Sequence, residues 1–152
     1  MKINTSRLRR FVQLASGPSI GYQADKKRQF RLDALFVLKA IADLMELQKD
    51  EFEIRWNEGG IAVSGEATLH SNEIYIQFAQ SAGGGNASFM WRTCKGQKDY
   101  TGGFNRWANW KSLLNLDTFV ERVLEVRAQI RGTAELGVLP RVQENKLSSA
   151  LA

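Results

Sequence analysis

The chain has 152 residues, of which 43% are hydrophobic and 24% charged, and its formal net charge is +5. This length fits one domain with a sizeable core, and the composition is ordinary for a globular protein. No apolar run approaches the roughly 18 residues that span a bilayer, and the basic N-terminus lacks the apolar run of a signal peptide. The single cysteine, Cys94, excludes an internal disulfide and agrees with a reducing compartment, so we expect a cytoplasmic location and no membrane partner.

The first predicted element is a short amphipathic helix at residues 7–15, capped by Thr5 or Ser6 and stopped by Gly17. Its outer face bears arginines. Residues 17–28 are then expected to form a polar loop that ends in a cluster of three cations.

The main core helix is expected at residues 30–47, where apolar residues occupy nearly every position. That pattern is typical of a helix covered on most sides.

After this helix the hydrophobic period changes from about 3.6 to 2, which indicates strands. Four strands are expected, at residues 52–57, 61–69, 74–78 and 89–94. Turns should lie at residues 58–60 and 70–72, with a flexible loop at 81–86. Such short connections favour an antiparallel meander, since parallel pairs need a long crossover.

A second amphipathic helix is predicted at residues 118–131, because Thr118 and Glu121 form a capping box, and Gly132 should end it. Residues 133–152 lack a sustained period and are expected to be a mobile or partner-dependent tail after a single domain of residues 1–132.

Together these elements predict an α+β fold, in which an antiparallel four-stranded meander packs against two main helices, with a short N-terminal helix in addition. The helices at 30–47 and 118–131 would cover one face of the sheet. The other face would be wet or would meet a partner.

The charges are segregated along the chain. Residues 1–31 hold eight cations and one acid, residues 32–90 three cations and nine acids, and residues 91–111 five cations and one acid. Two interpretations are open. In the first, folding gathers the positive segments onto one face, as a polyanion partner requires; in the second, the positive segments neutralise the acidic middle.

The most informative stretch is residues 91–111, WRTCKGQKDYTGGFNRWANWK, which interleaves aromatic rings with cations. Such a surface can hold a phosphate backbone and stack bases, at about 1–3 kcal/mol per stacked base. The candidate nucleic-acid-binding residues are Arg92, Lys95, Lys98, Tyr100, Arg106, Trp107, Trp110 and Lys111. The cations would meet phosphates, while Tyr100, Trp107 and Trp110 would stack on bases; on a helical turn the two tryptophans would share a face. The alternative is that the tryptophans fill the core and the cations only border it.

The remaining candidates for chemistry favour structural roles. Gly102-Gly103 lacks the phosphate-loop pattern and is predicted to be a turn. His70, the only histidine, is expected at a solvated hairpin end, and Cys94 is expected to be a structural thiol. A hydrolase built on Glu66, His70 and Asp99 would need those groups within hydrogen-bond reach of one cleft. We expect no metal and no cofactor, and the favoured interpretation is non-catalytic.

At Thr93-Cys94-Lys95-Gly96 and Lys98–Gly103, together with Gly60–Glu66, the chain resembles small uncharacterised proteins of bacterial phages and plasmids. The resemblance covers about a third of the chain. It implies an accessory role in a mobile element and assigns no functional residue.

Two functions follow as hypotheses. The first is a small basic accessory protein that binds nucleic acid, single-stranded rather than duplex, without catalysis. The alternative is a protein-interaction module, an inhibitor or assembly factor that docks on a host or phage protein, since tryptophan and arginine also anchor protein interfaces.

Overall fold

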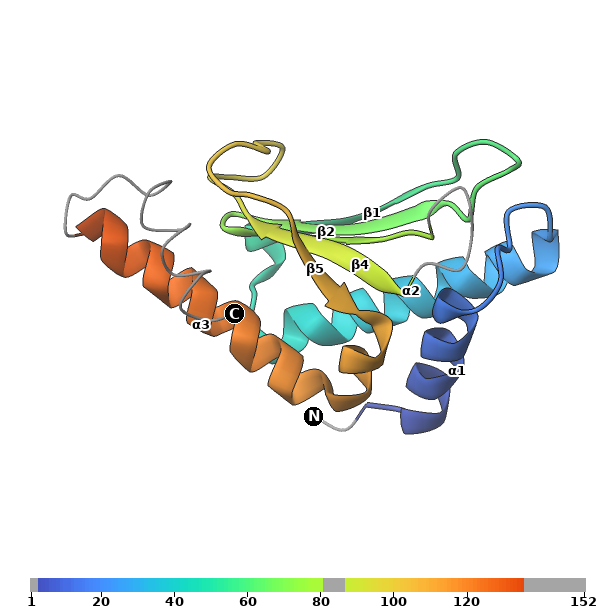
Figure 1. The fold of residues 1–152 in the computed structure, drawn as a ribbon. Helices are drawn as coiled ribbons and strands as arrows, with labels where there is room; N and C mark the ends of the chain where they lie inside the picture. Colours follow the sequence, from blue (N-terminus) through green and yellow to red (C-terminus); the bar gives the residue numbers. More distant parts are fainter. Residues whose placement is uncertain (1–2, 81–86, 136–152) are drawn as a thin grey trace.

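The computed structural model describes residues 3–80 and 87–135, and the side chains up to Thr133. Three helices pack on one face of a five-stranded antiparallel sheet with the strand order β1-β2-β3-β4-β5 (Figure 1). The helices are α1 (Thr5–Ser16), α2 (Ala24–Leu44) and α3 (Leu116–Glu135), with short 3-10 helices η1 (Lys49–Glu51) and η2 (Trp110–Asn115). The strands are β1 (Phe52–Asn57), β2 (Glu66–Ser71), β3 (Ile74–Phe78), β4 (Ser88–Thr93) and β5 (Arg106–Asn109). The α+β class and the antiparallel meander are confirmed.

The predicted count of four strands is wrong, because β5 adds a fifth strand at the edge of the sheet. β5 has only four residues, Arg106–Asn109, and a period of two cannot be established over so short a stretch. The spacing of Trp107 and Trp110 instead suggested a helical turn.

The starts of the first two helices differ from the prediction. Asn4 rather than Thr5 or Ser6 caps α1, since its side-chain oxygen accepts a hydrogen bond from the backbone N–H of Arg7 at 3.1 Å. Helix α2 begins at Ala24, so the cationic cluster Lys26–Arg28 lies within the helix and not in a loop. The segment that begins with Gly17-Pro18 and separates α1 from α2 therefore comprises only residues 17–23.

Strand β2 begins at Glu66 rather than at residue 61 and continues through His70 to Ser71. Gly65 ends the preceding turn with φ +87°, and a Cβ placed there would lie 2.3 Å from Cζ2 of Trp56. Only glycine therefore lets the chain enter β2 against this indole. The turn to β3 lies at Asn72 and Glu73, where the Ser71 hydroxyl accepts the N–H of Ile74 at 2.9 Å.

Helix α3 begins at Leu116, before the predicted capping box, and Gly132 does not end it. A glycine inside a helix costs only about 1 kcal/mol, and packing of the apolar face against the sheet offsets this. Residues 133–135 thus continue the helix. The rest of the predicted tail and the predicted loop at 81–86 lie outside the described residues.

The core lies between the sheet and the helices and is centred on Trp110, which is completely buried. Its indole packs on four phenylalanine rings at centroid distances of 5.1–6.4 Å. These rings come from α1, α2, β3 and β4, and they belong to Phe11, Phe30, Phe78 and Phe89. One residue of η2 therefore joins both layers of the fold.

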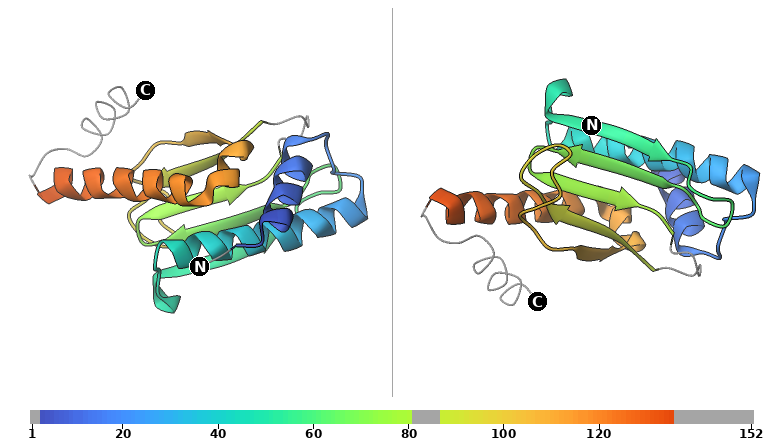
Figure 2. Two further views of the ribbon diagram at one scale, coloured as in Figure 1. Left: turned by 90° about the horizontal axis from the view of Figure 1, so that it is seen from below. Right: turned by 90° about the horizontal axis from the view of Figure 1, so that it is seen from above.

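The opposite face of the sheet is uncovered by helices. Figure 2 shows α1, α2 and α3 in front of the strands from below, and the strands in front of the helices from above. Two loops, at residues 58–65 and 94–105, rise at opposite ends of this open face (Figure 1). The expectation of one covered and one exposed face is confirmed. None of the helices in the described part of the chain is both long and apolar enough to cross a membrane.

Candidate nucleic-acid interface

The open face presents two adjacent rows of side chains, because residues that pair across strands point to the same side. One row comprises Arg55, Thr68, Gln77, Met90 and Trp107. The next row comprises Glu53, His70, Tyr75 and Arg92. Thr68, His70 and Tyr75 are buried, so the exposed part of the face is formed by the other side chains of the two rows, which carry both signs of charge.

Trp107 is the most exposed ring on this face. It pairs with Met90, and its side chain is 64% exposed. Its neighbours in β5, Arg106 and Ala108, point to the helical side because strand residues alternate. Trp107 is therefore accessible, as stacking on a base requires.

Trp110, by contrast, is 0% exposed and fills the core. Its assignment as a base-stacking residue is wrong. Trp107 lies in an extended strand and Trp110 opens a 3-10 helix, so the two indoles leave the chain on opposite sides of the sheet. Trp107 is thus exposed, as the base-stacking interpretation requires, whereas Trp110 fills the core, as the alternative interpretation predicts.

Tyr100 reaches the open face from the loop at residues 94–105. Its ring packs on His70 at a centroid distance of 4.8 Å and on Tyr75 at 5.3 Å, and it remains 50% exposed. A ring held on two others loses little conformational freedom when a ligand stacks on it. Trp107 and Tyr100 thus lie on the same face.

Arg92 holds this loop in place rather than projecting into solvent. Its guanidinium donates to the backbone oxygen of Gly103 and to the side-chain oxygen of Asn105. Gly102 has φ +86°, and a Cβ on Gly103 would lie 2.4 Å from the carbonyl oxygen of Thr93. The glycine pair therefore forms a turn and allows close backbone approach, which supports the structural interpretation of these glycines.

The other predicted phosphate-binding cations divide between two surfaces. Lys95 and Lys98 are exposed on the loop beside Tyr100. Arg106 lies on the helical side of the sheet, with its guanidinium 4.3 Å from the centroid of Phe104 and 5.5 Å from that of Trp91. Lys111 is exposed on η2 and lines a groove below β5. Of the predicted phosphate-binding cations, the two loop lysines and Arg92 thus lie on the open side of the sheet, whereas Arg106 and Lys111 lie on the helical side.

The basic N-terminal segment does not join this surface. Arg7 and Arg10 both bond to the buried carboxylate of Asp33, at 2.9 Å for the shortest contact of each. Lys27 is almost buried, and its amine donates to the carbonyl of Gly60 at 3.3 Å. These cations lie in α1 and at the start of α2, away from the 94–105 loop (Figure 1). The arrangement in which all positive segments share one face is wrong.

His70 is buried under Tyr100, with 3% of its surface exposed, and does not lie at a solvated hairpin end. Its Nδ1 accepts the backbone N–H of Lys98 at 3.3 Å and so fixes the loop to β2. Strand β2 extends to Ser71, two residues beyond the predicted end at residue 69, and this places His70 inside the strand. Burial lowers the pKa of His70, and Arg55 lowers it further.

Acid is therefore expected to destabilise the protein through His70. Since its folded pKa lies below its ordinary value of 6.5, the unfolded chain takes up the proton first. Stability is then full above about pH 6.5 and falls as the pH drops below it. Urea unfolding between about pH 7 and pH 5 should show this fall, and His70→Gln should reduce it. If the free energy of unfolding falls equally in the natural protein and in His70→Gln, His70 is not the group that causes the loss of stability.

The groups considered for catalysis do not form a site. Glu66 and His70 lie four residues apart along β2, or about 13 Å, which is beyond hydrogen-bond reach. The carboxylate of Asp99 accepts the N–H and hydroxyl of Thr101. Burial raises the pKa of Cys94 to about 11, so its thiol stays protonated. The part of the chain that the structure covers also contains no group of three potential metal ligands.

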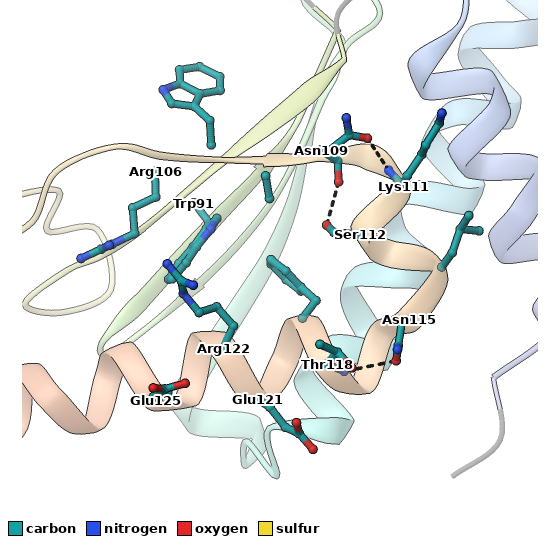
Figure 3. A pocket seen from close by; sticks show the side chains of 14 residues that line it. Trp91, Arg106, Asn109, Lys111, Ser112, Asn115, Thr118, Glu121, Arg122 and Glu125 are labelled. Carbon is teal, nitrogen blue, oxygen red and sulfur yellow. Dashed lines mark hydrogen bonds between the residues drawn. The ribbon is translucent and has the colours of Figure 1, made fainter. Parts of the chain in front are cut away.

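A groove of about 760 Å³ lies between β5 and α3 on the helical side of the sheet (Figure 3). Its apolar lining includes Trp91, Ala108 and Phe119, and Arg106 and Arg122 enter it from β5 and α3. No local pattern predicted this groove, because one of its walls is β5, the strand that was not predicted.

Comparison of the chain with protein-family models, curated proteins and solved structures finds no match.

Proposed function

We propose that this protein binds single-stranded nucleic acid across the open face of its sheet and is not an enzyme. The observation that supports the proposal best is the presence of two exposed rings, Trp107 and Tyr100, on a face that no helix covers. An antiparallel sheet with helices behind it and aromatic rings in front is a recurrent platform for unpaired bases. A duplex hides the faces of its bases, so stacking on these rings requires a single strand.

The dimensions of the face suit this use. Tyr100 rests on Tyr75. The Cα atoms of Trp107 and Tyr75 are about 12 Å apart, because two strand spacings and two residues along the strand separate them. Met90 and Arg92 lie between these rings. A strand that crosses the face diagonally could place one base on each ring.

The charges near the rings set the strength of binding. Lys95 and Lys98 can meet phosphates beside Tyr100, and each such contact adds a salt-dependent contribution. The acids Glu53 and Glu66 share the face, and Glu53 is neutralised by Arg55 at 2.7 Å. We therefore expect moderate affinity that weakens as salt is raised. Such a protein would suit the accessory role in a mobile element that the sequence resemblance implies.

Trp107→Ala should weaken binding of a fluorescent oligothymidylate about tenfold, since a stacked base contributes about 1–3 kcal/mol. Tyr22→Ala is a matched control, because Tyr22 is 80% exposed and precedes α2, on the other side of the fold from β5. Fluorescence anisotropy between about 50 and 200 mM salt would measure both effects. Equal affinities of the two variants, or no binding at the lowest salt, would refute the proposal.

A second candidate function is docking of a protein on the same face. The mixed charge of the face favours it, because Glu66 would repel a polyanion but can pair with a basic group of a protein. In that case Trp107 would be an interface anchor. Recovery of one stoichiometric protein after nuclease treatment, lost with Trp107→Ala, would support this function over the first.

A further inference from the structure

Strand β1 forms one outer edge of the sheet, opposite β5 (Figure 2). Among the described residues, β1 pairs with β2 alone. The bond from the N–H of Asn72 to the carbonyl of Glu51, at 3.2 Å, sets the phase of this pairing. Bonded positions alternate along an antiparallel strand, so every second residue of β1 bonds to β2, beginning with Glu53. The backbone groups of the residues between these positions point outward from the edge, and these residues are Phe52, Ile54 and Trp56.

The same three residues form an apolar row on the helical side of the edge, and each of them is only half-buried. Helix α2 runs beneath this row. Cζ of Arg31 lies 5.9 Å from the ring centroid of Trp56, and Nζ of Lys39 lies 5.5 Å from that of Phe52. Leu35 lies between these two cations on the same face of α2 and is also half-buried. The edge of β1 thus combines outward-pointing backbone groups with an apolar strip that the chain covers incompletely.

On the open side of the sheet, the two charges of β1 have opposite signs. Glu53 and Arg55 lie two residues apart and bond to each other at 2.7 Å through Oε2 and Nη2. Their side chains remain 45% and 39% exposed. A carboxylate accepts and a guanidinium donates several hydrogen bonds, so each group can add a second partner of opposite charge without losing the first.

These features fit one register of pairing between two copies of β1. Residues that lie opposite each other point to the same side of a sheet, so a two-fold axis between antiparallel strands must pass through a residue. An axis at Glu53 or Arg55 would place like charges directly opposite each other, which is unfavourable. An axis at Ile54 instead places Glu53 of each copy opposite Arg55 of the other. It also places Phe52 opposite Trp56, so that every outward-pointing residue lies in a bonded pair.

We propose that β1 pairs with β1 of a second copy of the chain about a two-fold axis at Ile54, which joins two sheets into one. Main-chain hydrogen bonds hold the strands together, as in other complexes that extend a sheet at its edge. The two apolar strips cover each other on the helical side, and the charges of Glu53 and Arg55 from both copies alternate on the open side. This interface lies at the edge of the sheet opposite Trp107 and does not depend on nucleic-acid binding.

The sequence of β1, FEIRWN, favours a second copy over an unrelated strand, because it carries the acid and the base at the spacing that its own edge requires. The strand has no net charge, so two copies of it do not repel each other. Beneath the sheet, Arg31 and Lys39 of one copy would approach those of the other. Asp43 lies 3.5 Å from Lys39 and offsets part of that positive charge.

The test is sedimentation equilibrium of the full chain over a wide range of protein concentration. The natural protein should show a reversible equilibrium between monomer and dimer. Arg55→Glu should weaken the dimer at least tenfold, because acid then faces acid at both symmetric positions, and Glu53→Arg should do the same with bases. Arg9→Glu, a charge reversal at an exposed position of α1, is the matched control and should leave the dimer unchanged.

Mixing the two charge variants separates dimerisation from folding. An equimolar mixture of Arg55→Glu and Glu53→Arg should form a heterodimer of restored affinity, because the acidic β1 then faces the basic one. Both variants lack the Glu53–Arg55 pair within a chain, so recovery on mixing cannot come from that pair. Trp107→Ala should dimerise like the natural protein. A chain that stays monomeric, equal dimerisation of Arg55→Glu and the natural protein, or no gain on mixing would overturn the proposal.

Discussion

Trp110→Ala is expected to lower the free energy of unfolding by about 3–5 kcal/mol, the range for truncating a fully buried tryptophan. The change would leave a cavity among Phe11, Phe30, Phe78 and Phe89, which come from both layers of the fold. Four rigid rings cannot collapse fully into that space. Urea unfolding followed by circular dichroism would measure the loss.

Two controls make this result specific. Trp107→Ala removes the same side chain from an exposed position three residues away and should change stability by about 0.5 kcal/mol or less. Trp110→Phe should cost less than Trp110→Ala, because the buried indole N–H has no hydrogen-bond partner among the described residues and only volume is lost. Similar losses for Trp107→Ala and Trp110→Ala would show that Trp110 is not the centre of the core.

Asp33→Ala is expected to cost about 2–3 kcal/mol and to loosen α1 from α2. The carboxylate is fully buried and accepts hydrogen bonds from Arg7, Arg10 and Gln29 at 2.9–3.1 Å. Bonds to charged groups contribute more than neutral ones, but both arginines are partly exposed and can be solvated when the carboxylate is removed. Hydrogen exchange of the α1 amides should rise more than that of α3.

The control is Asp43→Ala in the same helix, whose exposed pair with Lys39 at 3.5 Å should contribute at most about 0.5 kcal/mol. The pH dependence gives a second check. Burial raises the pKa of Asp33, but the hydrogen bonds from Arg10, Arg7 and Gln29 outweigh it, and the net pKa is lowered. Its stabilising contribution is therefore present above about pH 4 and is lost as the pH falls further. The two proteins should therefore become more similar in their free energy of unfolding as the pH falls below about 4. A difference in this free energy that stays constant in acid would contradict the role of Asp33.

The structure changes the basis of the nucleic-acid hypothesis. From the sequence, that hypothesis rests on clustered positive segments and on aromatic rings interleaved with cations. In the structure, Arg7, Arg10, Lys27 and Arg92 make contacts within the fold. What remains is a smaller surface, formed by two rings and two loop lysines. This is why the predicted salt dependence is moderate and why the effect of Trp107→Ala is the decisive measurement.

Patterns within single elements were sufficient to predict the fold class. An element that buries one face repeats its apolar residues with the period of that element. This period is about 3.6 in the helices α1, α2 and α3 and two in the strands β1, β3 and β4, so the sequence of each element indicates its type. Boundaries were less predictable. Asn4 caps α1 although Thr5 and Ser6 are equally good caps, and β5 is too short to show a period.

The candidate site depended on information that no local pattern holds. Trp107 and Trp110 are three residues apart and chemically identical, and only the change from strand to 3-10 helix between them decides which is exposed and which is buried. The packing of Tyr100 on His70 joins β2 to a loop that follows β4, and this contact between two distant segments places the ring on the open face. Composition and periodicity thus determined that this chain forms a one-sided α+β sandwich. Which rings and which cations face solvent was decided by the tertiary structure, because that outcome depends on strand pairing and on ion pairs between distant elements.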